Sequence, residues 1–165
     1  MLSADQLLDA LLERAHGPAA IETVPIAAAL GRVLATRQTS SITVPPADNS
    51  AMDGYAVRLA DVARVGVRLP LSQRILAGTV GQPLQPGTAA RIFTGAPVPP
   101  GADAVLMQED CSADGADVVI NKLPQPAENI RRAGEDIASG AQILAAGSRI
   151  GAAEMGLAAS VGLAE

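Results

Sequence analysis

The sequence predicts an α+β fold that is mainly β and has two lobes. From residue 44 onward, Gly and Pro recur every few residues, and short runs of β-type residues lie between them. An amphipathic helical pattern opens the chain, and a second helix-compatible stretch closes it. The apolar fraction is 48%, yet the chain has one Tyr, one Phe and no Trp. The core of such a protein must therefore be aliphatic.

The first predicted element is a helix that begins near Ser3. Ser3 and Gln6 have the spacing of a capping box. The apolar residues that follow fall on one helical face, namely Leu7, Leu8, Leu11, Leu12 and Ala15. Gly17-Pro18 is expected to end the helix. Next come a short strand at 21–24, a helical turn at 26–30 that ends at Gly31, and an extended segment at 33–42.

The middle of the chain predicts a barrel-like or sandwich-like β lobe. Its β-type runs are Tyr55–Arg58, Leu71–Leu76, Ala89–Thr94, Ala104–Gln108 and Val118–Leu123. Residues 143–150 then predict a hairpin around Gly147, and residues 152–161 predict a helix that stops at Gly162. We therefore expect a β-rich inserted lobe at 44–133. Residues 1–43 and 134–165 would together form a discontinuous, helix-containing lobe.

Composition excludes several classes of function. Lys and Arg number 12 and Asp and Glu number 17, so the formal net charge is −5. Nucleic acid is an unexpected partner, because phosphate backbones need a cationic surface and unpaired bases need aromatic platforms. A single cysteine allows no internal disulfide. The N-terminus lacks the basic region of a signal peptide, and no run approaches the ~18 apolar residues of a membrane helix. A cytoplasmic protein without membrane contact is expected.

The first candidate functional segment is 45–57. Two prolines stiffen its start, and Asp48, Asn49, Ser50 and Asp53 follow within six residues, just before a predicted strand. A loop of this kind can aim several oxygens at one point. The same residues are also ordinary turn and cap formers. The local sequence alone leaves open whether this segment binds a ligand or only forms a turn.

The second candidate segment is 92–103, where a strand ends in Thr94-Gly95 and runs into a rigid proline loop. A hydroxyl here stands beside a glycine, whose backbone can approach a ligand closely. A simple strand-ending turn explains the same residues.

The third candidate segment is 129–137, in which Arg131 and Arg132 precede Glu135 and Asp136. Arginine forks suit phosphate oxygens, and carboxylates suit magnesium. An anionic ligand would need local positive charge to offset the acidic field, and Arg131, Arg132 and Arg149 are the candidates. A surface cluster of ion pairs that neutralise one another is the alternative.

These three segments resemble a known family. The stretch Asp48-Asn49-Ser50-Ala51-Met52-Asp53-Gly54-Tyr55-Ala56-Val57 is similar to the signature of the MoeA family, the molybdopterin molybdenumtransferases, which includes the C-terminal part of gephyrin. Residues 91–99 and 129–137 are similar to two further family segments, in the same order and at similar spacing. The resemblance runs from the first helix to the last residue and implies the two-lobed fold of the family's N-terminal region.

The resemblance also implies an activity. Enzymes of this family insert molybdate into the dithiolene of adenylylated molybdopterin, release AMP and require Mg²⁺. Carried over residue by residue, the active-cleft residues would be Asp53, Thr94 and Asp136. Asn49, Ser50 and Arg131 would support the same surface by binding the cofactor.

The resemblance further implies that this chain supplies half of an intersubunit site. In the family, the cleft forms between the N-terminal lobes of one subunit and an α/β module of its partner in a homodimer. The sequence stops where that module would begin, so the α/β module and a small C-terminal β domain are expected to be missing. The rival hypothesis is a non-catalytic dimerisation or scaffold module, in which the apolar face of the first helix and the aliphatic β lobe pair with a second copy of the chain.

Overall fold

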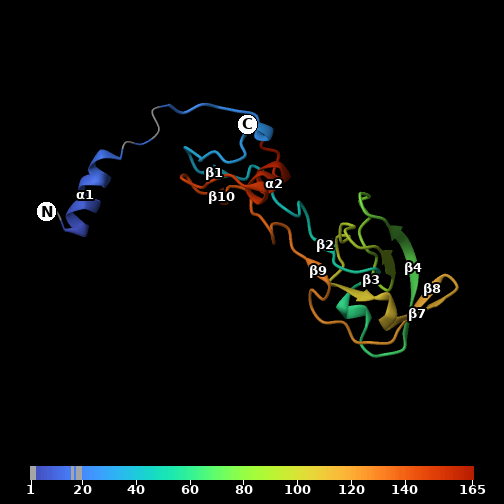
Figure 1. Ribbon diagram of the computed structural model, residues 1–165. Helices are drawn as coiled ribbons and strands as arrows, with labels where there is room; N and C mark the ends of the chain where they lie inside the picture. The colour runs from blue at the N-terminus through green and yellow to red at the C-terminus, as the bar shows by residue number, and fades with distance from the viewer. Residues whose placement is uncertain (1–2, 16, 18–19) are drawn as a thin grey trace. The chain divides into compact units, whose positions relative to one another are not determined.

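The computed structural model describes residues 3–15, 17 and 20–165, which form two compact units. One unit comprises Met1–Thr39 and Gln142–Glu165, and the other comprises Ser40–Ala141 (Figure 1). The chain thus crosses between units at 39/40 and 141/142, whereas the sequence placed the lobe boundaries at 43/44 and 133/134. Most of the regular structure is β, accompanied by two α-helices, so the predicted α+β, mainly β class is confirmed.

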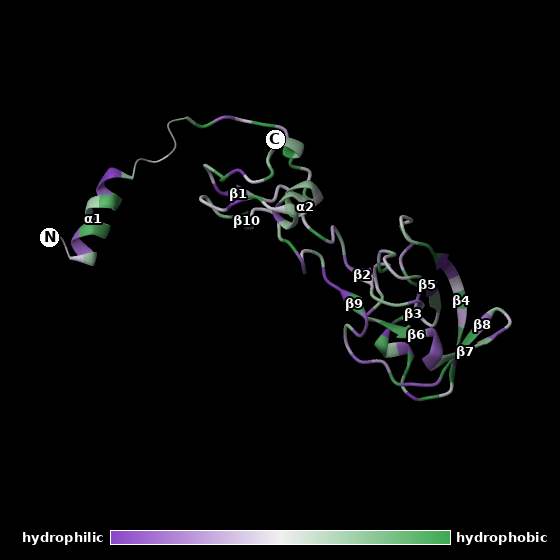
Figure 2. Ribbon diagram, viewed as in Figure 1, coloured by the Kyte–Doolittle hydropathy of each residue, from purple (hydrophilic) through white to green (hydrophobic). Residues whose placement is uncertain are grey.

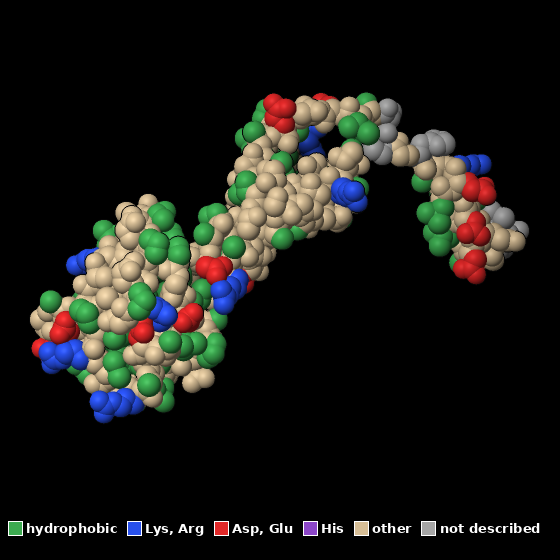
Figure 3. All heavy atoms as spheres, turned by 180° about the vertical axis from the view of Figure 1, so that it is seen from behind, with side chains coloured by type: hydrophobic (Ala, Val, Ile, Leu, Met, Phe, Trp, Pro, Cys, Tyr) green, Lys and Arg blue, Asp and Glu red, His purple; other side chains and the backbone are tan. Residues whose placement is uncertain are grey.

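The helix α1 (Ala4–Arg14) begins as predicted. The Ser3 hydroxyl accepts from the Gln6 N–H, and the Gln6 side chain accepts from the Ser3 N–H, which completes the capping box. No α1 residue is buried, and its four leucines are 51–62% exposed. Hydrophobic and acidic side chains occupy different sides of the helix (Figure 3). The helix ends at Arg14, before the predicted stop at Gly17-Pro18. Pro18 lies outside the described residues.

The remainder of this unit is a small assembly of short elements. β1 (Gln38–Thr39) pairs antiparallel with β10 (Gln142–Leu144), and Val33 bridges to Arg149. The short helix η1 (Ile26–Ala28) and α2 (Ala152–Ser160) complete it. The predicted strand at 21–24 is wrong, because this stretch forms no ladder. The predicted hairpin at 143–150 is also wrong. Gly147 does turn the chain, but apart from one turn bond between Ser148 and Ala145, both arms bond to residues 31–39 instead of to each other.

The second unit is built on a six-stranded curled sheet with the order β6-β3-β5-β4-β8-β7 (Figure 1). Its strands are β3 (Gly54–Val57), β4 (Val67–Ile75), β5 (Ala89–Ile92), β6 (Ala104–Met107), β7 (Cys111–Asp114) and β8 (Asp117–Ile120). Only the β4–β5 pair of this sheet is parallel. The short helices η2 (Leu59–Asp61) and η3 (Gln108–Asp110) follow β3 and β6. Each of the five β-type runs overlaps a strand, whereas β7 was not predicted.

Successive residues of a strand point to opposite sides, and the central strands β3, β5 and β6 are buried on both faces of the sheet. One aliphatic cluster contains Tyr55, Val57, Val62, Leu69, Ala89, Ala104, Leu106, Val118 and Ile120. The other contains Ala56, Ile75, Leu84, Ala90, Ile92, Ala96 and Val105. Hydrophobic colour accordingly runs along β6, while β4 alternates (Figure 2). The expected aliphatic core is present, with Tyr55 as its aromatic member.

Among the residues that the structure describes, no helix combines the length and the apolar character needed to cross a bilayer.

Candidate functional site

The three segments selected from the sequence meet around one short strand. β2 (Asn49–Ser50) pairs antiparallel with β9 (Ile130–Arg131), so Asn49 lies opposite Arg131. On its other side Asn49 bridges to Pro97. Two backbone hydrogen bonds of 2.8–2.9 Å join the first segment to the second: the Ser50 N–H donates to the carbonyl of Ala96, and the Gly95 N–H donates to the carbonyl of Ser50. Residues far apart in sequence are thereby held as one junction inside the unit Ser40–Ala141.

Asp53 and Thr94 are in direct contact. The Asp53 Oδ1 accepts from the backbone N–H of Thr94 at 2.8 Å and from the Thr94 hydroxyl at 2.7 Å. These bonds favour the ionised carboxylate and lower the pKa of Asp53, and the nearby charge of Arg91 adds to the effect. The second oxygen, Oδ2, accepts no hydrogen bond from the described residues. The pair therefore presents one free, ionised carboxylate oxygen to solvent.

Asp136 is held differently. Its Oδ1 accepts from Arg131 Nη2 at 2.5 Å, and Glu135 lies 3.6 Å from Arg131 Nε. All three side chains are 40–49% exposed. The hydrogen bond that Arg131 donates to Asp136 raises the pKa of Arg131. Within the described part of the chain, no hydrogen bond or ion pair links Asp136 to Asp53 or Thr94.

Arg132 is also neutralised, because it pairs with Asp48. Asp48 accepts from the Ala133 N–H at 2.8 Å as well, and this backbone bond, followed by the one from Arg132, lowers the pKa of Asp48. The third segment thus forms the ion-pair cluster that the sequence left open as an alternative. Its arginines face carboxylates of the same unit rather than standing free for an anion.

Ser50 and Asn49 act from inside the junction. Ser50 is 1% exposed, and its hydroxyl donates to the Met52 carbonyl at 2.6 Å while accepting from the Met52 N–H. This turn leads directly to Asp53. The Asn49 Oδ1 is buried without a hydrogen-bond partner in the described structure. The Ser50 side chain therefore supports the loop that carries Asp53.

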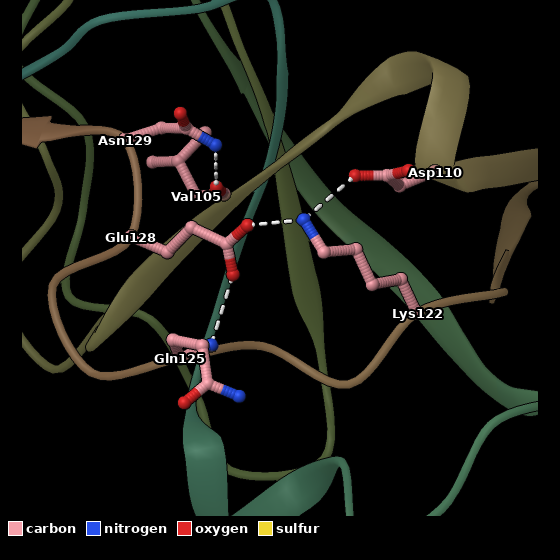
Figure 4. Close-up of polar contacts among 6 residues, drawn as sticks. All are labelled: Val105, Asp110, Lys122, Gln125, Glu128 and Asn129. Carbon is pink, nitrogen blue, oxygen red and sulfur yellow. Dashed lines mark hydrogen bonds and ion pairs between the residues drawn. The ribbon is translucent and has the colours of Figure 1, made fainter.

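A polar network fixes the third segment beside the sheet (Figure 4). Lys122 Nζ lies 2.5 Å from Glu128 Oε1 and 3.2 Å from Asp110 Oδ2. The Glu128 Oε2 accepts from the Gln125 N–H at 2.9 Å, and the Asn129 side-chain amide donates to the Val105 carbonyl at 2.9 Å. Burial acts to raise the pKa of Glu128, but the bonds from Lys122 and Gln125 outweigh it and lower that pKa. The network ties the chain before β9 to β6 and η3.

Arg91, which lies near Asp53, and its strand neighbour Arg74 were not identified as site residues from the sequence. Arg91 Nη1 donates to the Gly54 carbonyl at 2.9 Å, and Nη2 donates to Gln108 Oε1 at 2.6 Å. The Arg91 guanidinium carbon lies 4.6 Å from the Phe93 ring centroid, and that of Arg74 lies 4.7 Å from the same centroid. Arg91 also lies 5.0 Å from the ring centroid of Tyr55. Tyr55 and Phe93 stand close to Asp53 and Thr94 in the sequence. This proximity was the one sequence signal that could have pointed to the arginines stacked on these rings.

A cavity of about 380 Å³ opens beside Asp48 and Arg132, with Leu59, Val98 and the prolines Pro99, Pro100 and Pro126 in its wall. Asp53, Thr94 and Asp136 do not line it.

Comparison with known proteins identifies the family. Residues 2–162 match the family model described as the MoeA N-terminal region (domain I and II). The chain belongs to this family. It is 40% identical to a molybdopterin molybdenumtransferase of Haemophilus influenzae, covering 100% of this chain and 41% of that protein. Molybdopterin molybdenumtransferase 2 of Mycobacterium tuberculosis is 44% identical over 87% of this chain and 36% of its own length. The resemblance inferred from the three segments is confirmed.

Solved structures of the family share the fold. A structure of the molybdopterin biosynthesis MoeA protein from Pyrococcus horikoshii superposes with a TM-score of 0.81 at 31% identity, over 86% of this chain and 39% of that one. A gephyrin from Dictyostelium discoideum is 34% identical over 99% of this chain and 25% of its own length. This MoeA-family chain therefore spans about two fifths or less of the length of these relatives.

Proposed function

We propose that this chain is the N-terminal part of a longer cytoplasmic enzyme that inserts molybdate into adenylylated molybdopterin and releases AMP. Asp53, Thr94 and Asp136 would form its share of an active site between two subunits of a homodimer. Family membership and the names of the relatives support the reaction class. The contact between Asp53 and Thr94 is the observation that carries the assignment to residues.

The geometry of this contact suggests distinct roles for the two residues. The Thr94 hydroxyl donates its proton to Asp53, so its oxygen is left as an acceptor for a ligand donor. Asp53 keeps Oδ2 free in the ionised state, which suits it to orient a water molecule or to bind a cation. No raised pKa is needed for either task.

The residues present fit a weakly held Mg²⁺. Groups of three or more His, Cys, Asp or Glu side chains suited to a metal ion do not occur in the described part of the chain. Mg²⁺ is commonly bound through one or two carboxylates together with substrate phosphates and waters. Asp53 would supply one carboxylate, and Asp136, held by Arg131, would supply another when the site is assembled. Bound Mg²⁺ would neutralise charge on substrate phosphates.

Replacement of Asp53 tests the proposal. In the full-length enzyme, Asp53→Asn should lower the rate of molybdate-dependent AMP release at least about tenfold, because the amide cannot carry the carboxylate's charge. The folded structure should remain, as judged by circular dichroism. Asp114→Asn makes the same chemical change on an exposed strand of the same unit and should leave the rate unchanged. A full rate of AMP release by Asp53→Asn would refute the assignment.

A non-catalytic dimerisation or scaffold module is the second candidate, and one observation favours it. The four leucines of α1 are 51–62% exposed and lie on one face of this amphipathic helix. A helix face of this kind is usually covered by a partner. A second copy of the chain would be the occupant.

Sedimentation tests the second candidate. If α1 mediates self-association, the chain should sediment as a dimer, and Leu8→Ser with Leu11→Ser should dissociate it. Asp9→Ser, a polar change in the same helix, should not. A strictly monomeric chain at high concentration would count against the scaffold module.

Titration of adenylylated molybdopterin and Mg²⁺ into the 165-residue chain should give weak or no binding and no turnover under the enzymatic proposal.

A further inference from the structure

We propose that Arg74 and Arg91, stacked on Phe93, form an oxyanion-binding site beside Asp53 and Thr94. The ligand class is a phosphate or pyrophosphate group. The identity of the natural ligand rests on the proposed function, in which this site would hold the phosphates next to the bond that releases AMP. The site itself is argued from the charges, the sheet register and the unused hydrogen-bond donors.

The charge balance makes these two arginines unusual. The chain has a net charge of −5, and most cations of the unit Ser40–Ala141 have a carboxylate within 4.0 Å: Arg58, Arg68, Lys122, Arg131 and Arg132. In the described part of this unit, only Arg64, Arg74 and Arg91 lack one. Two of these three share a single aromatic ring. An acidic protein has carboxylates to spare, so an unpaired cationic pair marks a place where an anion is favourable.

The sheet register brings the two arginines together. Arg74 of β4 and Arg91 of β5 are direct partners across the parallel pair, so their side chains leave the same face. Like charges directly opposite each other destabilise a sheet. Phe93 lies two residues beyond Arg91 on the same face and offers its ring to both guanidinium groups. A bound oxyanion would remove the remaining repulsion.

Donors remain available for such an anion. Arg91 uses two of its five N–H groups, on Gly54 and Gln108. Arg74 donates no hydrogen bond within the described structure. Stacking on a ring covers the face of a guanidinium and leaves the N–H groups on its edge free. That edge matches the spacing of two phosphate oxygens.

The site is coupled to the residues proposed for catalysis. Arg91 holds the carbonyl of Gly54, next to Asp53, and it stacks on Phe93, next to Thr94. Its charge is also one of the causes that lower the pKa of Asp53. An oxyanion bound at Arg91 would screen that charge. The Asp53 carboxyl should then titrate at a higher pH when the site is filled.

Titration calorimetry with inorganic pyrophosphate tests the site in the 165-residue chain at low ionic strength. We expect saturable binding that weakens as salt is added. Arg74→Gln should weaken binding about tenfold or more, because it removes a bidentate charged contact. Arg64→Gln removes an equally unpaired charge of the same unit and should change affinity less than twofold. Phe93→Leu keeps both charges and should weaken binding by an intermediate factor.

Several outcomes would overturn the site. These are no saturable binding by the wild-type chain, equal weakening by Arg64→Gln, or molybdate binding as tightly as pyrophosphate at the same residues. Thermal unfolding of each variant shows that the fold is retained. Failure here is distinguishable from failure of the proposed function. Pyrophosphate binding requires no molybdate insertion, and the Asp53→Asn rate is measured with Arg74 and Arg91 unchanged.

Discussion

Gly54 is the residue at which the sheet and the candidate site constrain each other most closely. A Cβ atom at this position would lie 1.8 Å from the Leu106 carbonyl oxygen. β3 and β6 can pair at their observed separation only because residue 54 has no side chain. Its carbonyl meanwhile accepts from Arg91. The glycine therefore sets where Asp53 enters the site.

Gly54→Ala should lower the free energy of unfolding by about 2–3 kcal/mol, because a backbone atom, unlike a flexible side chain, cannot swing aside. Urea unfolding measures it. Gly156→Ala in α2 is the matched control, since its Cβ would meet nothing within 4 Å. That substitution should raise stability by about 0.5–1 kcal/mol through helix propensity. A Gly54→Ala protein as stable as wild type would contradict the close approach of β3 and β6.

Asp48 gives the junction a pH dependence. Its pKa is lowered below the ordinary 3.8 by the Ala133 N–H and then by Arg132. A carboxylate with a lowered folded-state pKa contributes full stability above about pH 4 and loses it as the pH falls through the folded value. The free energy of unfolding should therefore drop as the pH falls below about 4. Asp48→Asn should drop less over this range, and an equal drop in both proteins would contradict the role of Asp48.

At the scale of elements, the position of β9 depends on a polar network as well as on the packing of Ile130 against the second aliphatic cluster. Lys122, Glu128 and Asp110 anchor the chain that leads into β9, whose residues are only half-buried (Figure 4). The Glu128 carbonyl accepts from the Val105 N–H, and the Asn129 carbonyl accepts from the Ala51 N–H. Loosening this network should therefore be felt in β2.

Lys122→Met keeps most of the side-chain volume and removes the charge. We expect the amides of Ala51 and Gln125 to exchange with solvent about fivefold faster, because their acceptors lie on the loosened segment. Hydrogen exchange read by NMR measures this effect. The amide of Tyr55, within the central strand β3, serves as the internal control and should not change. Unaltered exchange at Ala51 would show that β2 and β9 hold each other without Lys122.

The elements also show what sequence reasoning can and cannot reach. β3, β4, β5, β6 and β8 carry β-branched or bulky apolar residues between turn signals, so they were predictable. β7 has the sequence Cys-Ser-Ala-Asp, which carries no such signal. It forms a strand because it pairs with β8. The hairpin at 143–150 failed for a related reason. Periodicity identifies an extended segment but not its partner, which here lies more than one hundred residues earlier.

In the candidate site, too, some residues were recognisable from the sequence, whereas the contacts between them were not. The motif residues Asp53 and Thr94 were recognisable, but their contact follows from the register of β3 against β5. Arg74 and Arg91 meet through a parallel pairing of β4 with β5, which no local pattern specifies. Arg131 was recognisable too, although its use in an ion pair with Asp136 required coordinates.

At the scale of the whole molecule, the two units differ in how much of their own core they contain. The unit Ser40–Ala141 holds the six-stranded sheet, both aliphatic clusters and all three candidate segments. Its ends are neighbours: the Ser40 N–H donates to the Ala141 carbonyl at 2.9 Å, and the Gly140 N–H donates to the Ser40 carbonyl at 2.7 Å. Adjacent ends are typical of an inserted domain that can fold alone.

Residues 40–141 expressed alone should therefore fold cooperatively. Urea unfolding followed by far-ultraviolet circular dichroism and by Tyr55 fluorescence should give one coincident transition. Pyrophosphate should bind this piece as it binds the whole chain, because Arg74, Phe93 and Arg91 all lie inside it. The other unit, joined through a short linker in place of 40–141, should unfold at much lower urea. Its described buried hydrophobic residues are only Leu144, Ile150 and Val161, too few to offset chain entropy. If residues 40–141 were unfolded alone, the sheet would depend on contacts outside its own unit.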